Sequence, residues 1–325
     1  MYLDNKLVLV AGATGLVGSS IIRQILANHS TTRIRATHLH TAPFIQHERV
    51  EYIEVDLKSE ADCQKLANGC DCAVMAAAAS AGGAGLVTSE PWRQVNDTLI
   101  MNTQMLQAFH HASVRRVIYI GSVTLYQDFE GHIQEDDLDL NQDPHKAYLG
   151  IGWVVRFTEK LCQFWRQYGM DILVARSANV FGPYARFDPR ASNFIPAIIR
   201  KAVERMDPFE VWGSPDVTRD VIYSEDLSQA IAMMMDNDRV RSGAFNIGSG
   251  VQTKVSDVVT WALKSAGHAP RHIKYLADRP TTNKFRALDC SKIKATLGWQ
   301  PQHTIEQGVQ KTTEWWLENK ERWNK

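Results

Sequence analysis

The amino-acid sequence predicts an α/β fold in which a doubly wound, Rossmann-like parallel sheet carries a smaller mixed α/β lobe. The first observation is that short apolar stretches alternate with helical stretches through the first half of the chain, a pattern that implies parallel strands joined by right-handed crossovers. The second is that the opening apolar strand runs directly into a turn with three evenly spaced glycines and then into an apolar helix. The third is a change of character after residue 183, where irregular segments interrupt the alternation.

The expected elements follow from these patterns in chain order. Apolar runs predict strands at residues 7–10, 33–38, 50–55, 72–78, 116–120, 171–176, 219–223 and 245–247. Helical periodicity predicts a first helix after the glycine turn and further helices at residues 61–67, 92–111, 150–168, 196–205, 224–236, 255–266 and 304–319. The small residues at 79–85 predict a loop at the carboxyl edge of the sheet, where such folds bind ligands. We assign residues 1–177 and about 217–247 to the sheet domain, and residues 178–216 and 248–325 to the lobe.

The glycine turn is the most informative stretch of the sequence. Gly12 permits the tight turn off the strand, Gly15 lets the backbone approach a phosphate without a Cβ in the way, and Gly18 allows close helix–sheet packing. The helix that follows would present free N–H groups and the positive end of its dipole to phosphates. The combination predicts a dinucleotide site, and the alternative is a glycine-rich turn in an ordinary α/β unit. The expected cofactor contacts here are Gly12, Thr14, Gly15, Leu16, Val17 and Gly18.

The end of the second strand bears on which dinucleotide is bound. NAD-preferring proteins of this kind place a carboxylate there to bind the ribose hydroxyls, and this chain has none. Because a carboxylate would repel a 2′-phosphate, its absence favours NADP(H) over NAD(H). The candidate donors to that phosphate are Arg35, Thr37, His38 and His40, although each could also be an ordinary surface residue.

The composition argues against several other classes of protein. Lys plus Arg and Asp plus Glu both number 36, so the net charge is zero and the basic surface typical of nucleic-acid binding is not expected. No apolar run reaches the roughly 18–20 residues of a membrane span, and the opening segment is too short and polar for a signal peptide. The five cysteines are odd in number, which favours reduced thiols, and the scattered histidines do not suggest a metal site. We therefore expect a cytoplasmic protein without a nucleic-acid partner, a membrane anchor or a metal.

Further motifs follow the glycine turn in a fixed order. They are Asp56-Leu57, Gly121-Ser122 with Tyr126, Asn179-Val180-Phe181-Gly182-Pro183, Ser192-Asn193-Phe194-Ile195-Pro196, Val211-Trp212-Gly213-Ser214, Thr218-Arg219-Asp220 with Ser224-Glu225-Asp226, Asn246-Ile247-Gly248-Ser249-Gly250 and Leu297-Gly298-Trp299-Gln300-Pro301. Together they make the sequence resemble, over nearly its whole length, the extended short-chain dehydrogenases/reductases of the NAD-dependent epimerase/dehydratase family. Among these it is most similar to the nucleotide-sugar reductases of the GDP-L-fucose synthase type.

The resemblance implies roles for residues beyond the glycine turn. Asp56 and Leu57 would lie near the adenine, and Ala76, Ala77 and Ala78 would line the dinucleotide backbone. Asn96 would add a further cofactor contact. The resemblance also implies a homodimer, because relatives pair the helices predicted at residues 92–111 and 150–168 into a four-helix interface.

The same family uses Ser or Thr, Tyr and Lys for proton transfer. Ser122 matches the first of these, and Thr124 stands where fucose synthases carry a cysteine. The Tyr-x-x-x-Lys pair is absent in either possible register. If Tyr148 is the family tyrosine, the lysine position is Gly152. The second register, which fits the rest of the helix better, has Ile151 and Val155 at these two positions.

Three interpretations of this departure remain open. Tyr148 could act as the acid with Lys146 or Arg156 as a nearby cation, or the protein could carry out chemistry that avoids the dyad. In the third interpretation it binds cofactor and sugar nucleotide without turnover. Tyr148 could also be an ordinary half-buried aromatic near a helix start.

On the substrate side, the resemblance implies that Arg219 and Arg286 pair with the pyrophosphate of a nucleotide sugar. Arginine suits this role because its planar fork donates two parallel hydrogen bonds and stays charged. The further candidates are Asn179 and Asn193 as sugar or phosphate ligands and Trp212 as a cover for the base, with surface ion pairs and core packing as the alternatives.

The sequence therefore predicts an NADP(H)-dependent reductase or epimerase-type enzyme that acts on a nucleotide-activated keto-deoxy sugar. The alternatives are a catalytically silent paralogue that binds cofactor or sugar nucleotide as a scaffold, and a cofactor-sensing regulator. Tyr184 stands where fucose synthases place a catalytic histidine. Together with Thr124 this argues against epimerisation of the fucose-synthase kind.

Overall fold

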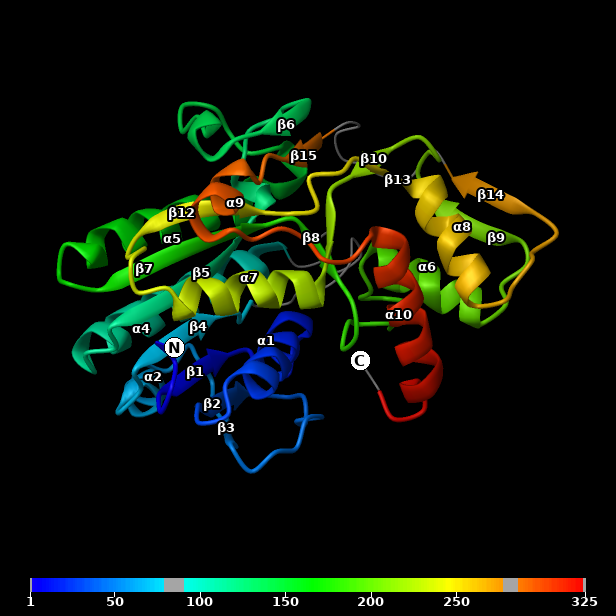
Figure 1. Cartoon of the computed structure of the whole chain (residues 1–325). Coiled ribbons are helices and arrows are strands. Elements are labelled where there is room, and N and C mark those ends of the chain that lie inside the picture. Colours follow the sequence, from blue (N-terminus) through cyan, green and yellow to red (C-terminus); the bar gives the residue numbers. More distant parts are fainter. Residues whose placement is uncertain (1, 79–90, 277–285, 324–325) are drawn as a thin grey trace.

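A computed structural model of the chain describes residues 2–78, 91–276 and 286–323. Its centre is a seven-stranded sheet in the order β12-β7-β5-β4-β1-β2-β3, in which every neighbouring pair is parallel (Figure 1). These strands are β1 (Leu7–Ala11), β2 (Arg33–His38), β3 (Val50–Glu54), β4 (Cys72–Met75), β5 (Arg116–Ser122), β7 (Asp171–Ser177) and β12 (Gly243–Ile247). The predicted doubly wound parallel sheet is confirmed.

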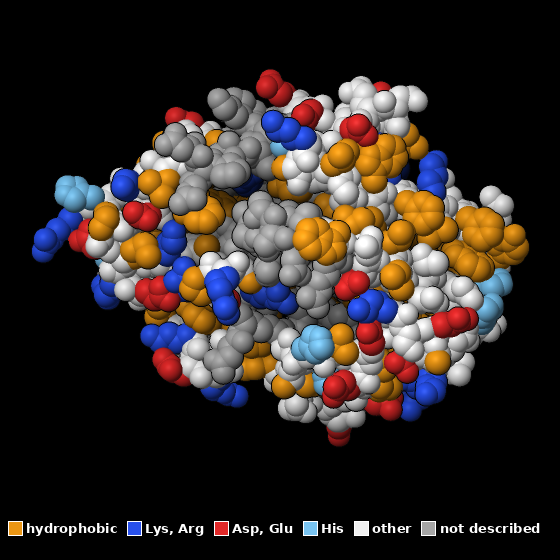
Figure 2. Space-filling model, turned by 180° about the vertical axis from the view of Figure 1, so that it is seen from behind, with side chains coloured by type: hydrophobic (Ala, Val, Ile, Leu, Met, Phe, Trp, Pro, Cys, Tyr) orange, Lys and Arg blue, Asp and Glu red, His pale blue; other side chains and the backbone are white. Residues whose placement is uncertain are grey.

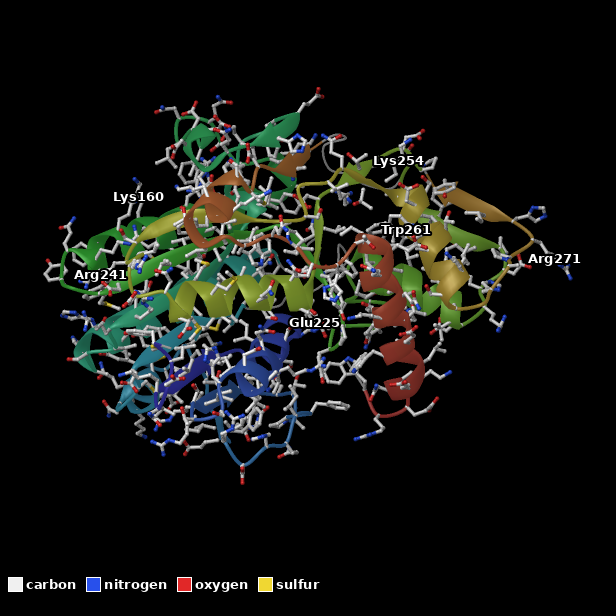
Figure 3. All side chains as sticks on the ribbon, viewed as in Figure 1. Lys160, Glu225, Arg241, Lys254, Trp261 and Arg271 are labelled. Atoms are coloured by element: carbon white, nitrogen blue, oxygen red, sulfur yellow. The ribbon has the colours of Figure 1, made fainter. Side chains whose placement is uncertain are left out.

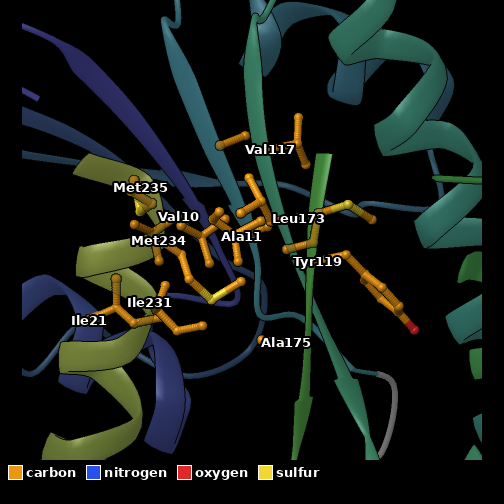
Figure 4. Packing of buried hydrophobic residues seen from close by; sticks show 14 of the residues in the cluster. Val10, Ala11, Ile21, Val117, Tyr119, Leu173, Ala175, Ile231, Met234 and Met235 are labelled. Atoms are coloured by element: carbon orange, nitrogen blue, oxygen red, sulfur yellow. The ribbon is translucent and has the colours of Figure 1, made fainter. Parts of the chain in front are cut away.

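Helices cover both faces of this sheet. They are α1 (Leu16–Asn28) and α7 (Ser224–Asp236) on one face, and α2 (Glu60–Ala67), α4 (Pro91–His111) and α5 (Leu149–Arg166) on the other. Figure 4 shows Ile21 of α1 and Ile231 of α7 packing towards Val10 of β1, all fully buried. Burying side chains on both faces is what makes these strands continuous apolar runs in the sequence.

The rest of the chain forms a second packing unit beside the carboxyl edge of the sheet. Its elements are β8 (Asn179–Phe181), α6 (Phe194–Val203), β9 (Phe209–Trp212), β10 (Thr218–Arg219), β11 (Val221–Tyr223), β13 (Thr253–Lys254), α8 (Val255–Ser265), β14 (Ile273–Leu276) and α10 (Ile305–Asn319). Phe209, Val259 and Val309 belong to a hydrophobic cluster separate from that of the sheet. Two short parallel strands, β6 (Gly131–Ile133) and β15 (Arg286–Leu288), lie near the border, and α9 (Ser291–Leu297) follows them.

The two clusters divide the chain differently from the predicted domains at two places. Leu288, Ile293 and Trp299 pack with the sheet, although they fall within residues 248–325. Val221 and Tyr223 pack with the second cluster, although they fall within residues 217–247. The reason is that α9 contacts β12, whereas β11 pairs with β8 rather than joining the large sheet. The domain boundaries therefore stay a prediction.

The strand predicted at residues 219–223 is interrupted at Asp220, which separates β10 from β11. The buried Asp220 carboxylate accepts hydrogen bonds from the backbone N–H groups of Ser249 (2.8 Å), Gly250 (3.3 Å) and Leu288 (2.9 Å), and from the Ser249 hydroxyl (2.8 Å). These donors come from two other segments, so Asp220, at the break between β10 and β11, joins three segments of the chain. Burial raises the pKa of Asp220, although these four hydrogen bonds oppose that rise.

Other motifs behind the family resemblance also hold the fold together. The fully buried Asn246 accepts a hydrogen bond from the Tyr126 hydroxyl at 2.6 Å. That hydroxyl in turn accepts one from Arg176, whose guanidinium forms a buried 2.8 Å ion pair with Glu159. Asp226 accepts hydrogen bonds from the backbone just after the Leu297–Pro301 motif. These motifs therefore have structural roles in this chain.

The predicted loop at residues 79–85 lies outside the described residues. The strand expected at 72–78 ends at Met75, and the helix expected at 196–205 begins two residues earlier, at Phe194. None of the helices that the structure describes is both long and apolar enough to span a membrane.

Candidate functional site

The glycine turn between β1 and α1 shows why two of its three glycines are required by the fold. Gly12 has φ +78°, and a Cβ there would lie 2.7 Å from the Cα of Ala77. A Cβ on Gly18 would lie 2.7 Å from the Cα of Ala13, so α1 can approach the turn this closely only without a side chain. Any residue larger than glycine at these positions would force backbone to move.

Gly15 is different, because the fold itself makes little demand on it. Its φ of −78° is open to any residue, and an added Cβ would meet only the Gly12 carbonyl oxygen, at 3.3 Å. Gly15 is the N-cap of α1, no side chain caps that end, and the first turn carries no acidic residue. The helix N-terminus therefore has the open, positive character that binds a phosphate group. The turn thus fits the pyrophosphate of a dinucleotide.

The end of β2 lies directly beside this turn. Thr37 accepts a hydrogen bond from the Gly12 N–H through its hydroxyl (2.9 Å) and one from the Ala13 N–H through its carbonyl (3.0 Å). His38, the last residue of β2, is half-buried with its ring edge-on to Tyr52. These contacts hold the strand end against the glycine turn.

Arg35 departs from its predicted role as a phosphate donor. Its guanidinium donates to the carbonyl oxygens of Leu66 and Asn68, both at 2.8 Å, and pairs with Glu51 at 3.4 Å. It therefore ties β2 to the C-terminal end of α2 and to β3. The sequence pattern placed Arg35 on the correct strand, but could not show that its side chain leaves the strand towards α2.

The remaining cofactor candidates lie around the same sheet edge. Asp56 follows β3 and accepts a hydrogen bond from the Lys58 N–H at 3.0 Å, and Leu57 is buried in the core of the sheet. Ala76, Ala77 and Ala78 follow β4, and Ala77 contacts the glycine turn as described. Asn96 is exposed on α4. Their roles in cofactor binding stay predictions.

Five of the predicted catalytic and substrate residues line one pocket. These are Thr124, Tyr148, Asn179, Arg219 and Arg286. They come from the short helical turns after β5 and before α5, and from β8, β10 and β15, so five parts of the chain converge. Asn193 and Trp212 are not among the described residues that line it; both are exposed, Trp212 by 53%.

The electrostatics of this pocket are dominated by its two arginines. Burial lowers the pKa of both the Arg219 and the Arg286 guanidinium, and the charge of Arg219 lowers that of Arg286 further. Both line the same pocket as Tyr148, and Arg286 also lies over the Phe129 ring, 5.3 Å from its centroid. Because arginine stays protonated, two partly desolvated positive charges face one small space, an arrangement that favours an anion.

The cations predicted to assist Tyr148 are not the ones that the structure brings to it. Arg156 is buried and donates to the carbonyl oxygens of Leu125 (2.7 Å) and Gln142 (2.6 Å). Lys146 is exposed. The nearby cations are instead Arg219 and Arg286, which the sequence suggested only as substrate ligands. Sequence spacing missed this because the arginines lie on strands far from Tyr148 in the chain.

The two candidate dyad registers have different surroundings. A Cβ on Gly152 would lie 2.6 Å from both the Pro144 Cβ and the Thr124 carbonyl oxygen, so no lysine fits at that position. Val155 is 4% exposed, and its Cγ1 lies 3.4 Å from where a Gly121 Cβ would be. Val155 therefore packs beneath the Gly121-Ser122 turn, as the second register requires, and its neighbour on the helix, Ile151, is half-buried. Neither side chain can carry a proton.

The hydroxyl groups of Ser122, the last residue of β5, and Thr124 differ in their hydrogen bonding. Ser122 accepts a hydrogen bond from the Thr124 N–H at 3.3 Å, which caps the short helical turn. The buried Thr124 hydroxyl, in contrast, has no hydrogen-bond partner within the parts of the chain that the structure describes. A buried polar atom without a partner is costly, so a ligand oxygen in the pocket would satisfy it.

Sequence analysis missed some residues of the pocket. Val123, Phe129, Thr218, Asp220 and Ala287 also line it. Thr218 and Asp220 flank Arg219, so their motif could have indicated them, whereas the contact of Phe129 with Arg286 spans the chain and leaves no local signal. Across the described ranges, no group of three or more His, Cys, Asp or Glu side chains could hold a metal ion.

The fold and the glycine turn together are those of the short-chain dehydrogenase/reductase class. Residues 8–248 match the model of the NAD dependent epimerase/dehydratase family, and the chain belongs to that family. The family accounts for the order of motifs along the chain.

Individual relatives agree with this assignment. The chain is 27% identical over 328 residues to GDP-L-fucose synthase of Sinorhizobium fredii, with 98% of each chain covered. It is 36% identical over 171 residues to dTDP-glucose 4,6-dehydratase of Haemophilus influenzae, with 49% of each chain covered. A solved structure of UDP-glucose 4-epimerase with UDP-glucose from Thermotoga maritima has a TM-score of 0.84 at 20% identity and covers 96% of this chain and 99% of that one. The two curated relatives support a nucleotide-sugar-modifying enzyme. The solved structure, at 20% identity, supports the fold.

Proposed function

We propose that this protein is a reductase or epimerase-type enzyme that binds NADP(H) at the glycine turn and a nucleotide-activated keto-deoxy sugar in the Tyr148 pocket. The observation that carries the proposal is the convergence of Tyr148, Arg219 and Arg286 on one pocket. The bound nicotinamide would supply the hydride acceptor or donor. A preference for NADP(H) over NAD(H) rests on the absence of a carboxylate at the end of β2.

The chain's own residues have separable roles in this proposal. Arg219 and Arg286 would bind the pyrophosphate of the sugar nucleotide, since guanidinium groups bind phosphate oxygens in pairs. The Thr124 hydroxyl would hydrogen-bond a sugar oxygen, and Tyr148 would move the proton at that oxygen. With Arg219 and Arg286 as its nearby cations, Tyr148 would have a positive environment from residues other than lysine.

A second candidate function is binding without turnover. It is favoured by the burial of Val155 and the position of Ile151, which leave the family's dyad positions without a proton carrier. In that case the same pocket would hold the sugar nucleotide, and the protein would act as a scaffold or regulator. Both candidates share the two ligands and differ only in the proton-transfer step.

We further propose that the protein is a cytoplasmic homodimer without nucleic-acid partners. The helix α5 exposes the apolar side chains of Leu149, Trp153, Phe157 and Phe164 at helical spacing, and Tyr168, two residues after its end, is also exposed. Figure 2 shows hydrophobic side chains gathered on the side of the molecule where α4 and α5 lie. An apolar helical face of this length is suited to pairing with its copy across a two-fold axis.

The test of the shared part is calorimetric titration with GDP as the probe for the pyrophosphate site. Arg219→Gln should weaken GDP binding by about ten- to a hundredfold, because a charge-assisted hydrogen bond contributes about 1.5–3 kcal/mol. The matched control is Arg271→Gln, since Arg271 lies at the far tip of the lobe (Figure 3) and is 89% exposed. Equal nucleotide binding by all three proteins, or no binding of GDP, UDP or dTDP by the wild type, would refute the pyrophosphate site. The nucleotide that binds most tightly would identify the base.

A further inference from the structure

An aromatic cluster joins the loop after β2 to the C-terminal end of the chain. The ring of Phe44 in this loop lies 5.6 Å from Tyr184, 6.2 Å from Trp315 and 5.4 Å from Trp323, measured between centroids. Each of these contacts is edge-to-face, the arrangement that aromatic pairs prefer. We call these four residues the aromatic clasp. It links a loop of the sheet domain to residues about 140–280 positions further along the chain.

The C-terminal side of the aromatic clasp is well fixed. Trp323 is 5% exposed, and its indole N–H donates to the Ala185 carbonyl oxygen at 2.7 Å. Trp315 lies 5.0 Å from Tyr184 and 5.4 Å from Trp323. The guanidinium of Arg322 lies over the outer face of Phe44, 5.3 Å from its centroid. Phe44 is therefore held on several sides by residues that do not themselves belong to its loop.

The loop held in this way borders the glycine turn. Residues 39–49 contain no helix or strand, so their own backbone does little to order them. The loop begins directly after Thr37 and His38, and Thr37 is bonded to the glycine turn. In addition, Leu16 at the start of α1 and Ile45 of the loop both pack against the same hydrophobic cluster as Phe44. A displacement of Phe44 would therefore also shift residues at the edge of the proposed dinucleotide site.

We propose that the aromatic clasp positions loop 39–49 for the adenosine half of the dinucleotide, with Phe44 as the positioning residue. In folds of this kind the adenosine ribose lies at the end of the second strand, which is where this loop starts. The proposal rests on the proposed function only in that the glycine turn must bind a dinucleotide. If truncating Phe44 leaves the loop correctly placed about a tenth of the time, the apparent Kd rises about tenfold, because affinity scales with the competent fraction.

The experiment compares wild-type protein with Phe44→Ala, Trp323→Ala and Phe44→Tyr by calorimetric titration. NADP(H) and adenosine 2′,5′-bisphosphate should each bind about tenfold more weakly to Phe44→Ala and Trp323→Ala. The Kd of nicotinamide mononucleotide for both variants should lie within about twofold of the wild-type value, and so should the Kd of GDP at the Arg219 pocket. Phe44→Tyr keeps the ring and should restore adenosine binding.

A matched control separates positioning from loss of stability. Trp316→Ala removes a ring that stacks on Phe187, 4.0 Å between centroids, in the same cluster but away from the loop. It should lower the Tm while leaving dinucleotide affinity unchanged. The proposal is overturned if Phe44→Ala binds adenosine 2′,5′-bisphosphate as wild type does, or if Trp316→Ala weakens binding equally. Absence of dinucleotide binding by the wild-type protein would instead refute the proposed function, so the two failures are distinguishable.

Discussion

The glycine turn at β1–α1 and the first turns of α5 lie at the same edge of the sheet and differ in how far they keep the features that the family uses. The turn has all three glycines in the conformations that a dinucleotide site needs. On α5, Ile151 and Val155 are the residues that the second register predicts at the family's tyrosine and lysine positions, and Val155 is packed into the fold. Under the proposed function, ligand binding and proton transfer are therefore separable, because the glycine turn keeps the residue types that the family uses and the second register of α5 does not.

The largest expected effect separates binding from folding within the glycine turn. Gly15→Asp should reduce dinucleotide affinity by roughly a thousandfold, because a carboxylate about 4 Å from a phosphate is opposed by about 4 kcal/mol near a protein surface. The Tm should change little, since Gly15 has ordinary backbone angles and an added Cβ would meet only the Gly12 carbonyl oxygen, at 3.3 Å. Isothermal titration and thermal unfolding of the same sample measure both quantities.

The contrasting variant is Gly18→Val, whose added atoms would meet the Ala13 backbone. It should be strongly destabilised, by several kcal/mol in free energy of unfolding, as overpacking against backbone predicts. If Gly15→Asp were equally destabilised, the distinction between the two glycines would be wrong.

A second prediction concerns the proposed role of α5 in dimer formation. Phe157 is 48% exposed on this helix, and Phe157→Asp should shift the proposed dimer to monomer, because a charge at the centre of an apolar interface weakens association by roughly a hundredfold or more. Sedimentation or light scattering at micromolar concentration measures this. Leu317→Asp is the control, since Leu317 is 45% exposed on α10 in the lobe. A wild-type protein that is already monomeric would remove assembly as a role for α5.

The smallest expected effect concerns the cofactor. NADP(H) should bind several-fold more tightly than NAD(H), because no carboxylate opposes the 2′-phosphate at the end of β2. With Arg35 engaged by α2, the attraction is left to residues such as His38 and His40, so the preference should be modest. Competitive titration measures the ratio, and equal or tighter binding of NAD(H) would contradict it.

Much of the proposed dinucleotide-binding region could be predicted from the sequence because the patterns that indicate it are local. A strand, three glycines and a helix occupy one short stretch, and the spacing of the glycines alone indicates where the backbone of the turn must be approached closely. The parallel sheet and most of its helices were predicted from the same kind of pattern. The direction of Arg35 did not, because periodicity assigns a residue to a strand without showing where a long side chain ends.

The pocket around Tyr148 was harder to predict because it is formed by residues that are distant in the chain. Neither register considered in the sequence contains a lysine, but Arg219 and Arg286 share a pocket with Tyr148 only through the packing of β10 and β15. The unpartnered Thr124 hydroxyl and the aromatic clasp are also products of long-range contacts. No local pattern marks such features, since they exist only once the lobe lies against the sheet.

The most direct test of the account is turnover of a keto-deoxy nucleotide sugar with NADPH, measured for three proteins under saturating ligands. The wild type should turn over weakly or not at all, and Tyr148→Phe should remove whatever activity exists while leaving dinucleotide affinity unchanged, since a positioned acid contributes about 10²–10⁴ in rate. The double change Ile151→Tyr with Val155→Lys should raise turnover, because Ser122 and the glycine turn are already in place. Rapid turnover by the wild type that persists in Tyr148→Phe would contradict the account and require a proton carrier other than Tyr148.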